Sequence, residues 1–168
     1  MNGKRKNILV LGLGNPILGD DRLGLMLIGD LQKIKALNQR VRFQTSTQAG
    51  LYLLDLLIGF QQAVFIDSII CPLEKAGGVK LWPLNDTPSY VLGSSPHYIG
   101  VSSMIAIGKR LNLQMPEKIW LIGISIKDGR QIGEALSPEI EKQYPQILKQ
   151  VQYFLEEILT TSQELICV

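Results

Sequence analysis

The sequence has few of the side chains on which common metalloenzymes and hydrolases depend. Its 168 residues include one histidine, His97, and two cysteines, Cys71 and Cys167. Two thiols are too few for a cysteine-rich zinc site, and one imidazole excludes a site built on two or three histidines of the same chain. A metal site would therefore take most of its ligands from carboxylates, and a Ser-His-Asp or Cys-His enzyme would have to use His97.

A strong net charge and long apolar runs are also missing. The 17 basic and 15 acidic residues give a net charge of +2, which does not indicate a nucleic-acid binder. The apolar run at 8–11 ends at Gly12, whereas a secretory signal needs about 7–15 apolar residues. No stretch reaches the roughly 18–20 apolar residues of a membrane span. We therefore expect a cytoplasmic protein with free thiols and with no nucleic-acid or membrane partner.

Short, continuous apolar runs alternate with longer amphipathic segments along the chain. The apolar runs predict strands at 7–13, 41–45, 63–70, 79–82 and 118–124. The amphipathic segments predict helices at 22–37, 50–58 and 98–111, and a last helix from Pro138 to about residue 159 that Pro145 kinks or interrupts. This alternation predicts an α/β fold: a single three-layer domain over residues 1–168, with a mostly parallel, twisted central sheet of about five strands flanked by helices on both faces.

A glycine-rich loop follows the first predicted strand, at the end of the sheet where such folds bind ligands. It spans residues 12–24 and reads GLGNPILGDDRLG. Asp20 and Asp21 lie at the entry to the next helix, where a carboxylate often caps free N–H groups. Capping needs only one carboxylate, and two adjacent ones repel each other unless a cation or a donor-rich partner is near. Helix capping and ligand binding both remain open for this pair.

Two further polar residues follow the same pattern at other strand ends or loops. Asp67 interrupts the apolar run FIDSII, where a buried carboxylate is costly unless it is paired, hydrogen-bonded or metal-bound. A strand-end aspartate that caps a turn is the alternative. His97 precedes a predicted helix, and a hydrogen bond to a loop would account for it alone. Because the fold class brings these segments to one rim, two carboxylates and one imidazole form a plausible divalent-ion site.

Two other interpretations of the glycine-rich loop fit less well. A dinucleotide-binding fingerprint would need glycine where Ile17 stands, and the paired aspartates would repel a pyrophosphate. The segment GLGNP also resembles the opening of peptidyl-tRNA hydrolase. In that family a glycine follows the proline and a catalytic histidine lies nearby, and neither is present here. An esterase of that kind is kept as the alternative function.

The loop, Asp67 and His97, taken in this order, resemble the hydrogenase maturation proteases. These endopeptidases process the large subunit of nickel-iron hydrogenases. The resemblance continues through VFIDS at 64–68, SPH at 95–97, LIGI at 121–124 and LSPE at 136–139, so it covers nearly the whole chain.

The resemblance implies a function and a set of site residues. Asp21, Asp67 and His97 would be the nickel ligands and the catalytic residues of an aspartate- or metal-dependent protease, and Asp20 and Asn15 would support the loop. The partner would be a nickel-loaded large-subunit precursor, which supplies the nickel and loses a short C-terminal extension. We expect a monomer. A non-cleaving, metal-dependent assembly chaperone is a second alternative.

The sequence departs from the family pattern at two places. Many members carry Asp-Gly-Gly-Thr after the second strand, where this chain reads TSTQAG at 45–50. Many also read Gly-Ile-Glu-Pro at the last strand, where this chain reads GISI at 123–126. The first departure removes an acidic residue from a loop linked to substrate recognition, and together they indicate a divergent subgroup.

Overall fold

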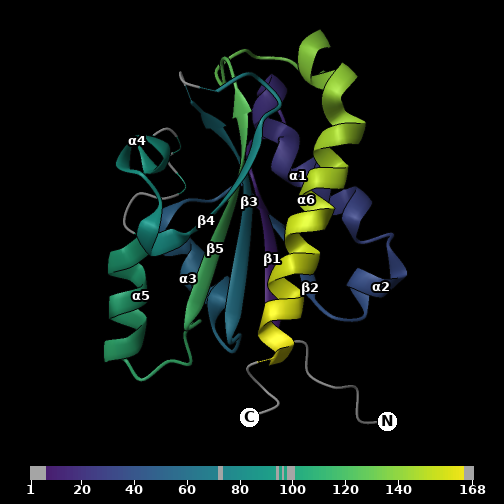
Figure 1. Cartoon of the computed structure of the whole chain (residues 1–168). Helices are drawn as coiled ribbons and strands as arrows, with labels where there is room; N and C mark the ends of the chain where they lie inside the picture. The colour runs from purple at the N-terminus through teal and green to yellow at the C-terminus, as the bar shows by residue number, and fades with distance from the viewer. Residues whose placement is uncertain (1–6, 72–73, 94, 96, 98–100, 165–168) are drawn as a thin grey trace.

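A five-stranded sheet forms the centre of the protein (Figure 1). The computed structural model describes residues 7–71, 74–93, 95, 97 and 101–164. The strands are β1 (Ile8–Leu13), β2 (Arg42–Ser46), β3 (Gln62–Ile70), β4 (Val79–Pro83) and β5 (Lys118–Ile126). They lie in the order β2-β1-β3-β5-β4, and all pairs are parallel except that of β4 with β5. The predicted mostly parallel sheet is confirmed.

The central strands β1, β3 and β5 carry apolar side chains on both faces because both faces are covered. Side chains alternate along a strand, so Val64 and Ile66 of β3 face one apolar cluster, whereas Ala63 and Phe65 face another. All four are at most 1% exposed. Burial on both faces explains why these strands read as continuous apolar runs rather than as alternating patterns.

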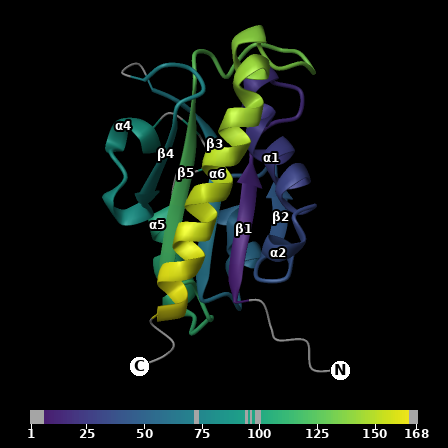
Figure 2. The same cartoon turned by 45° about the vertical axis from the view of Figure 1, so that its right-hand side comes forward.

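Helices form the two outer layers. One face is covered by α1 (Leu23–Leu31), α2 (Lys35–Asn38) and the long α6 (Pro138–Glu164), which runs across the sheet in Figure 2. The other face is covered by α3 (Leu54–Leu57) and α5 (Val101–Arg110), with α4 (Ser89–Leu92) beside them. Short 3-10 turns precede α1, α3 and α4; these are η1 (Gly19–Arg22), η2 (Gly50–Leu53) and η3 (Leu84–Asp86). The three-layer α/β prediction is confirmed.

Two predicted helices are shorter than expected. The helix predicted at 22–37 is divided, because the extended backbone of Ile34 separates α1 from α2 and lets α2 bury Leu37. The helix predicted at 50–58 is η2 followed by α3. The first three residues of the helix predicted at 98–111 lie outside the described residues.

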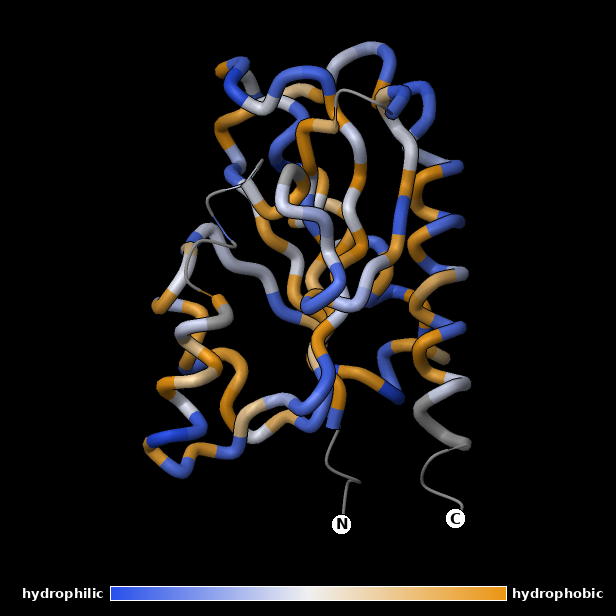
Figure 3. Tube along the Cα trace, turned by 60° about the vertical axis from the view of Figure 1, so that its left-hand side comes forward, coloured by the Kyte–Doolittle hydropathy of each residue, from blue (hydrophilic) through white to orange (hydrophobic). Residues whose placement is uncertain are grey.

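The last helix passes Pro145 without a break, so the predicted interruption is wrong. Proline removes one backbone hydrogen bond, the one that would reach the carbonyl of Glu141. The buried residues Ile140, Ile147 and Val151 hold the helix against the sheet on both sides of the proline. Figure 3 shows hydrophobic and hydrophilic residues alternating along α6, as expected for a helix with one buried face.

A tyrosine–aspartate hydrogen bond joins α6 to α1. The Tyr144 hydroxyl donates to Asp30 Oδ2 at 2.8 Å, and Lys33 pairs with Asp30 Oδ1 at 2.7 Å. Burial, helped by the Asp30 carboxylate, raises the pKa of Tyr144 above its usual range. The hydrogen bonds from Lys33 and Tyr144 lower the pKa of Asp30.

We expect Tyr144→Phe to lower the free energy of unfolding by about 1 kcal/mol at neutral pH, because it removes one partly buried hydrogen bond. The folded state keeps Tyr144 protonated above its unfolded pKa, so this contribution is present below about pH 10 and is lost as pH rises further. Urea unfolding at pH 7 and pH 11 measures it. Tyr153→Phe, at a tyrosine whose side chain is 64% exposed, is the control and should change neither value.

No helix in the described part of the chain is long and apolar enough to span a membrane. Cys71 is buried and has a free thiol, as predicted, whereas Cys167 lies outside the described residues.

Candidate functional site

The glycine-rich loop places Asp21 at the carboxyl end of β1. Asp21 Oδ1 accepts a hydrogen bond of 2.7 Å from the Ser68 hydroxyl of the neighbouring strand β3. Two glycines make this close packing possible. A Cβ atom on Gly14, whose φ is +147°, would lie 2.1 Å from the Asp21 carbonyl, and one on Gly24 would lie 2.2 Å from the Leu13 carbonyl. The motif therefore fixes Asp21 against the sheet because side chains are absent at these two positions.

The adjacent Asp20 binds a different part of the chain. Its two carboxylate oxygens accept hydrogen bonds from the Ser137 backbone N–H at 2.7 Å and the Ser137 hydroxyl at 2.8 Å. Arg22 adds a hydrogen bond to the Glu134 carbonyl. Neither η1 nor α1 has a side-chain cap, so the capping interpretation is wrong for both elements. Asp20 instead ties the motif to the residue that precedes α6.

We expect Asp20→Ala to lower the free energy of unfolding by about 2 kcal/mol, because it leaves two part-buried donors of Ser137 without their acceptor. Asp20→Asn keeps one acceptor oxygen and should recover about half of the loss. Urea denaturation of both variants measures these values. Equal stability of wild type and Asp20→Ala would contradict the assigned role.

Asp67 lies inside β3, opposite Gly123 of β5, and is fully buried. The sequence predicted a strand over 63–70, and β3 ends at Ile70 as predicted, so Asp67 lies three residues before its end. Its Oδ2 accepts a hydrogen bond of 2.9 Å from the Ser95 hydroxyl. The turn-capping alternative is therefore wrong, and Asp67 is linked instead to the segment that carries His97.

His97 is 5% exposed and is oriented by a backbone carbonyl. Its Nδ1 lies 2.8 Å from the Gln48 carbonyl oxygen, which can only accept a hydrogen bond. Nδ1 must therefore carry the proton, and in the neutral ring the lone pair is on Nε2. The His97 backbone N–H donates to the Ser95 hydroxyl at 3.3 Å, so Ser95 connects His97 with Asp67. A metal-binding histidine is typically held in this way through its other nitrogen.

Asp21 and His97 line the same pocket. Its volume is about 430 Å³, and it opens among the ends of β1, β3 and β5. The lining residues are Asn15, Leu18, Asp21, Thr47, Ala49, Ser68, Ile70, His97, Ile126, Gly129 and Arg130. Asp67 does not line the pocket, although the adjacent Ser68 does. Among the residues that the structure describes, no three histidine, cysteine, aspartate or glutamate side chains are grouped closely enough to hold a metal ion.

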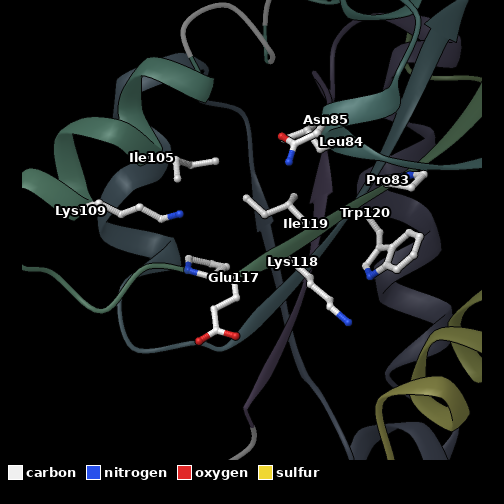
Figure 4. Close-up of a pocket in the computed structure, with 10 residues that line it drawn as sticks. Pro83, Leu84, Asn85, Ile105, Lys109, Glu117, Lys118, Ile119 and Trp120 are labelled. Carbon is white, nitrogen blue, oxygen red and sulfur yellow. The ribbon is translucent and has the colours of Figure 1, made fainter. Parts of the chain in front are cut away.

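A second pocket lies away from these residues (Figure 4). It has a volume of about 360 Å³ and is formed by α5, η3 and the start of β5. Ile105 and Lys109 from α5 face Ile119 of β5 across it. None of the predicted site residues lines this second pocket, so the predicted chemistry belongs to the pocket at the carboxyl ends of the strands.

Three contributors to the site escaped the sequence analysis. Ser68 and Ser95 hold the two aspartates, and the Gln48 carbonyl orients His97. The serines could have been found by asking which donors stand next to a buried carboxylate. The Gln48 carbonyl leaves no side-chain signal, because any residue could supply it.

Similarity to known proteins extends over most of the chain, in sequence and in fold. No family model matches the chain. The chain is 26% identical over 151 residues to the hydrogenase 2 maturation protease of Escherichia coli K12, which covers 89% of this chain and 91% of that protein. The match to the hydrogenase expression/formation protein HupD of Thiocapsa roseopersicina is 25% over 153 residues, covering 89% and 68%.

The chain resembles the hydrogenase maturation proteases. The similarity to these proteases extends from the sequence to the fold. The hydrogenase maturating endopeptidase HybD of E. coli superposes with a TM-score of 0.68 at 22% identity, covering 90% of this chain and 93% of that one. The [NiFe] hydrogenase maturation protease HybD of Thermococcus kodakarensis gives 0.61 at 20% identity, covering 88% and 98%. The resemblance predicted from the motif is confirmed.

Proposed function

We propose that the chain is a cytoplasmic endopeptidase that removes a C-terminal extension from the nickel-loaded large-subunit precursor of a nickel-iron hydrogenase. The observation that carries the proposal is that Asp21 and His97, from distant parts of the sequence, line one pocket. The similarity to the E. coli hydrogenase 2 maturation protease over most of both chains supports it.

In this proposal the nickel is part of the substrate, and the pocket residues recognise it. Imidazole nitrogen and carboxylate oxygen are both suitable nickel ligands. His97 is held with the Nε2 lone pair available, and Asp21 is held by Ser68 with its second carboxylate oxygen left for the substrate. Asp67 is the third proposed ligand; it accepts a hydrogen bond from Ser95, which in turn accepts one from the His97 backbone N–H.

The chemistry of the proposed reaction is hydrolysis of one peptide bond. The oxygen of a water molecule adds to the scissile carbonyl carbon, a carboxylate accepts the water proton, and the carbon–nitrogen bond breaks as the amine takes up a proton. Asp21 is the proposed base because it lines the pocket. The substrate's nickel either docks the precursor or also polarises the scissile carbonyl.

The test is to mix the purified protein with nickel-loaded and with nickel-free precursor and to measure the precursor mass. We expect the nickel-loaded precursor to lose the mass of its C-terminal extension and the nickel-free precursor to keep its full mass. Stable co-elution without a mass change would contradict the proposal and favour a non-cleaving chaperone. Equal cleavage of both samples would show that nickel recognition is not part of the function.

A further inference from the structure

Exposed apolar side chains gather beside the pocket of Asp21 and His97. The described part of the chain exposes eight large apolar side chains. Four of them lie within three residues of a pocket-lining residue in the sequence: Ile17 (59% exposed), Leu51 (58%), Tyr52 (75%) and Ile132 (83%). Scattered apolar residues on a surface need no explanation, but a concentration around one pocket indicates a binding surface.

Two of these residues are held on a fixed backbone. The segments of Ile17 and Ile132 are joined by an isolated antiparallel bridge between Leu18 and Ile132. The Gly133 N–H donates to the Ile17 carbonyl at 3.0 Å, and the Ile17 N–H donates to Asn15 Oδ1 at 3.1 Å. An apolar side chain on an ordered backbone loses less conformational freedom when a partner covers it.

The same surface carries a positive charge that is weakly paired. Arg130 lines the pocket, and its Nε lies 4.0 Å from Asp128 Oδ1. The two side chains are 90% and 61% exposed, and an exposed pair at that distance contributes little stability. A guanidinium group in this position can form a two-point hydrogen-bonded pair with a carboxylate of a partner.

We propose that this rim, formed by Ile17, Leu51, Tyr52, Arg130 and Ile132, docks the folded body of the large-subunit precursor. Arg130 lines the pocket itself, and Ile132 pairs with the pocket-lining Leu18, so a partner that places its metal between Asp21 and His97 lies against this rim. The complementary surface of the precursor would carry apolar side chains that contact the four apolar rim residues, and an acidic side chain that pairs with Arg130. This inference rests on the proposed function and adds the surface by which the precursor is recognised outside the pocket.

The double variant Ile17→Ser/Ile132→Ser tests the apolar part. We expect KM for the nickel-loaded precursor to rise about tenfold and kcat to stay within about twofold, since the changes remove contacts made equally in the bound and transition states. The matched control is Ile107→Ser/Leu111→Ser, at side chains 42% and 62% exposed near the far end of α5. The control should keep the wild-type KM.

Charge reversal tests the role of Arg130. Arg130→Glu should raise KM at least as much as the apolar double variant, and Arg130→Gln should weaken the salt dependence of KM. Arg110→Glu, an exposed arginine at the end of α5, is the control for net charge.

The outcomes separate the two proposals. If wild type cleaves the precursor but the rim variants keep its KM, the docking surface is wrong and the proposed function stands. A fall in kcat of the rim variants with an unchanged KM would also contradict the docking surface. If wild type neither binds nor cleaves the precursor, the proposed function is wrong, and the docking surface is overturned with it.

Discussion

His97→Ala is expected to abolish cleavage of the nickel-loaded precursor, with a loss of about a thousandfold or more. The variant removes the imidazole that lines the pocket, and the single histidine of the chain leaves no other imidazole to replace it. Cleavage is followed by the mass of the precursor, and co-elution with the precursor reports binding separately.

His97→Asn is the matched control for the fold. Its side-chain amide can still donate a hydrogen bond to the Gln48 carbonyl, as Nδ1 of His97 does in the wild type. We expect His97→Asn to unfold at the wild-type urea concentration and yet to leave the precursor intact. Wild-type cleavage by either variant would contradict the role of His97.

The two adjacent aspartates offer a second comparison within the same prediction. Asp21→Asn should lose cleavage to the same extent as His97→Ala, because its carboxylate lines the pocket. Asp20→Asn should keep most of the cleavage, because the Asp20 carboxylate points to Ser137. Asp67→Asn is expected to abolish cleavage as well. Equal losses for Asp20→Asn and Asp21→Asn would mean that the two carboxylates share one role.

The sequence predicted the three layers of the fold and the end of the sheet at which the site lies, because both follow from the spacing of apolar residues and from the parallel direction of the strands. Continuous apolar runs identify strands covered on both faces, and parallel strands bring their carboxyl ends to one edge of the sheet. These rules placed the motif loop, Asp67 and His97 at one end of the molecule. Of these three predicted site residues, Asp21 and His97 line one pocket, whereas Asp67 does not.

Other features depend on contacts that no periodicity encodes. Asp67 is buried because β5 pairs along the whole of β3 and Ser95 donates to the Asp67 carboxylate, and both partners come from distant parts of the chain. The bond from Asp20 to Ser137 spans more than a hundred residues. The orientation of His97 depends on a main-chain carbonyl, so the loss of the acidic residue from the loop at 45–50 does not remove that support.

Ser95→Ala is expected to lower cleavage strongly without abolishing it. The Ser95 hydroxyl donates to Asp67 and accepts from the His97 backbone N–H, so one side chain holds two proposed ligands in register. Loss of such a supporting group typically lowers metal affinity or activity by about 10- to 100-fold. We therefore expect cleavage to fall within that range, with KM for the precursor rising because the ligands are displaced rather than removed.

Ser95→Thr separates this role from a loss of packing, because threonine keeps the hydroxyl and adds one methyl group. We expect Ser95→Thr to recover most of the cleavage that Ser95→Ala loses. Ser103→Ala, at an exposed residue of α5, should leave cleavage unchanged. If Ser95→Ala cleaves as fast as wild type, the Ser95 hydroxyl does not position the site. If Ser95→Thr is as stable as wild type but does not recover cleavage, the hydroxyl alone is not sufficient.

The same network predicts that Ser95→Ala adds little to the defect of Asp67→Asn, since groups that act as one unit lose activity non-additively.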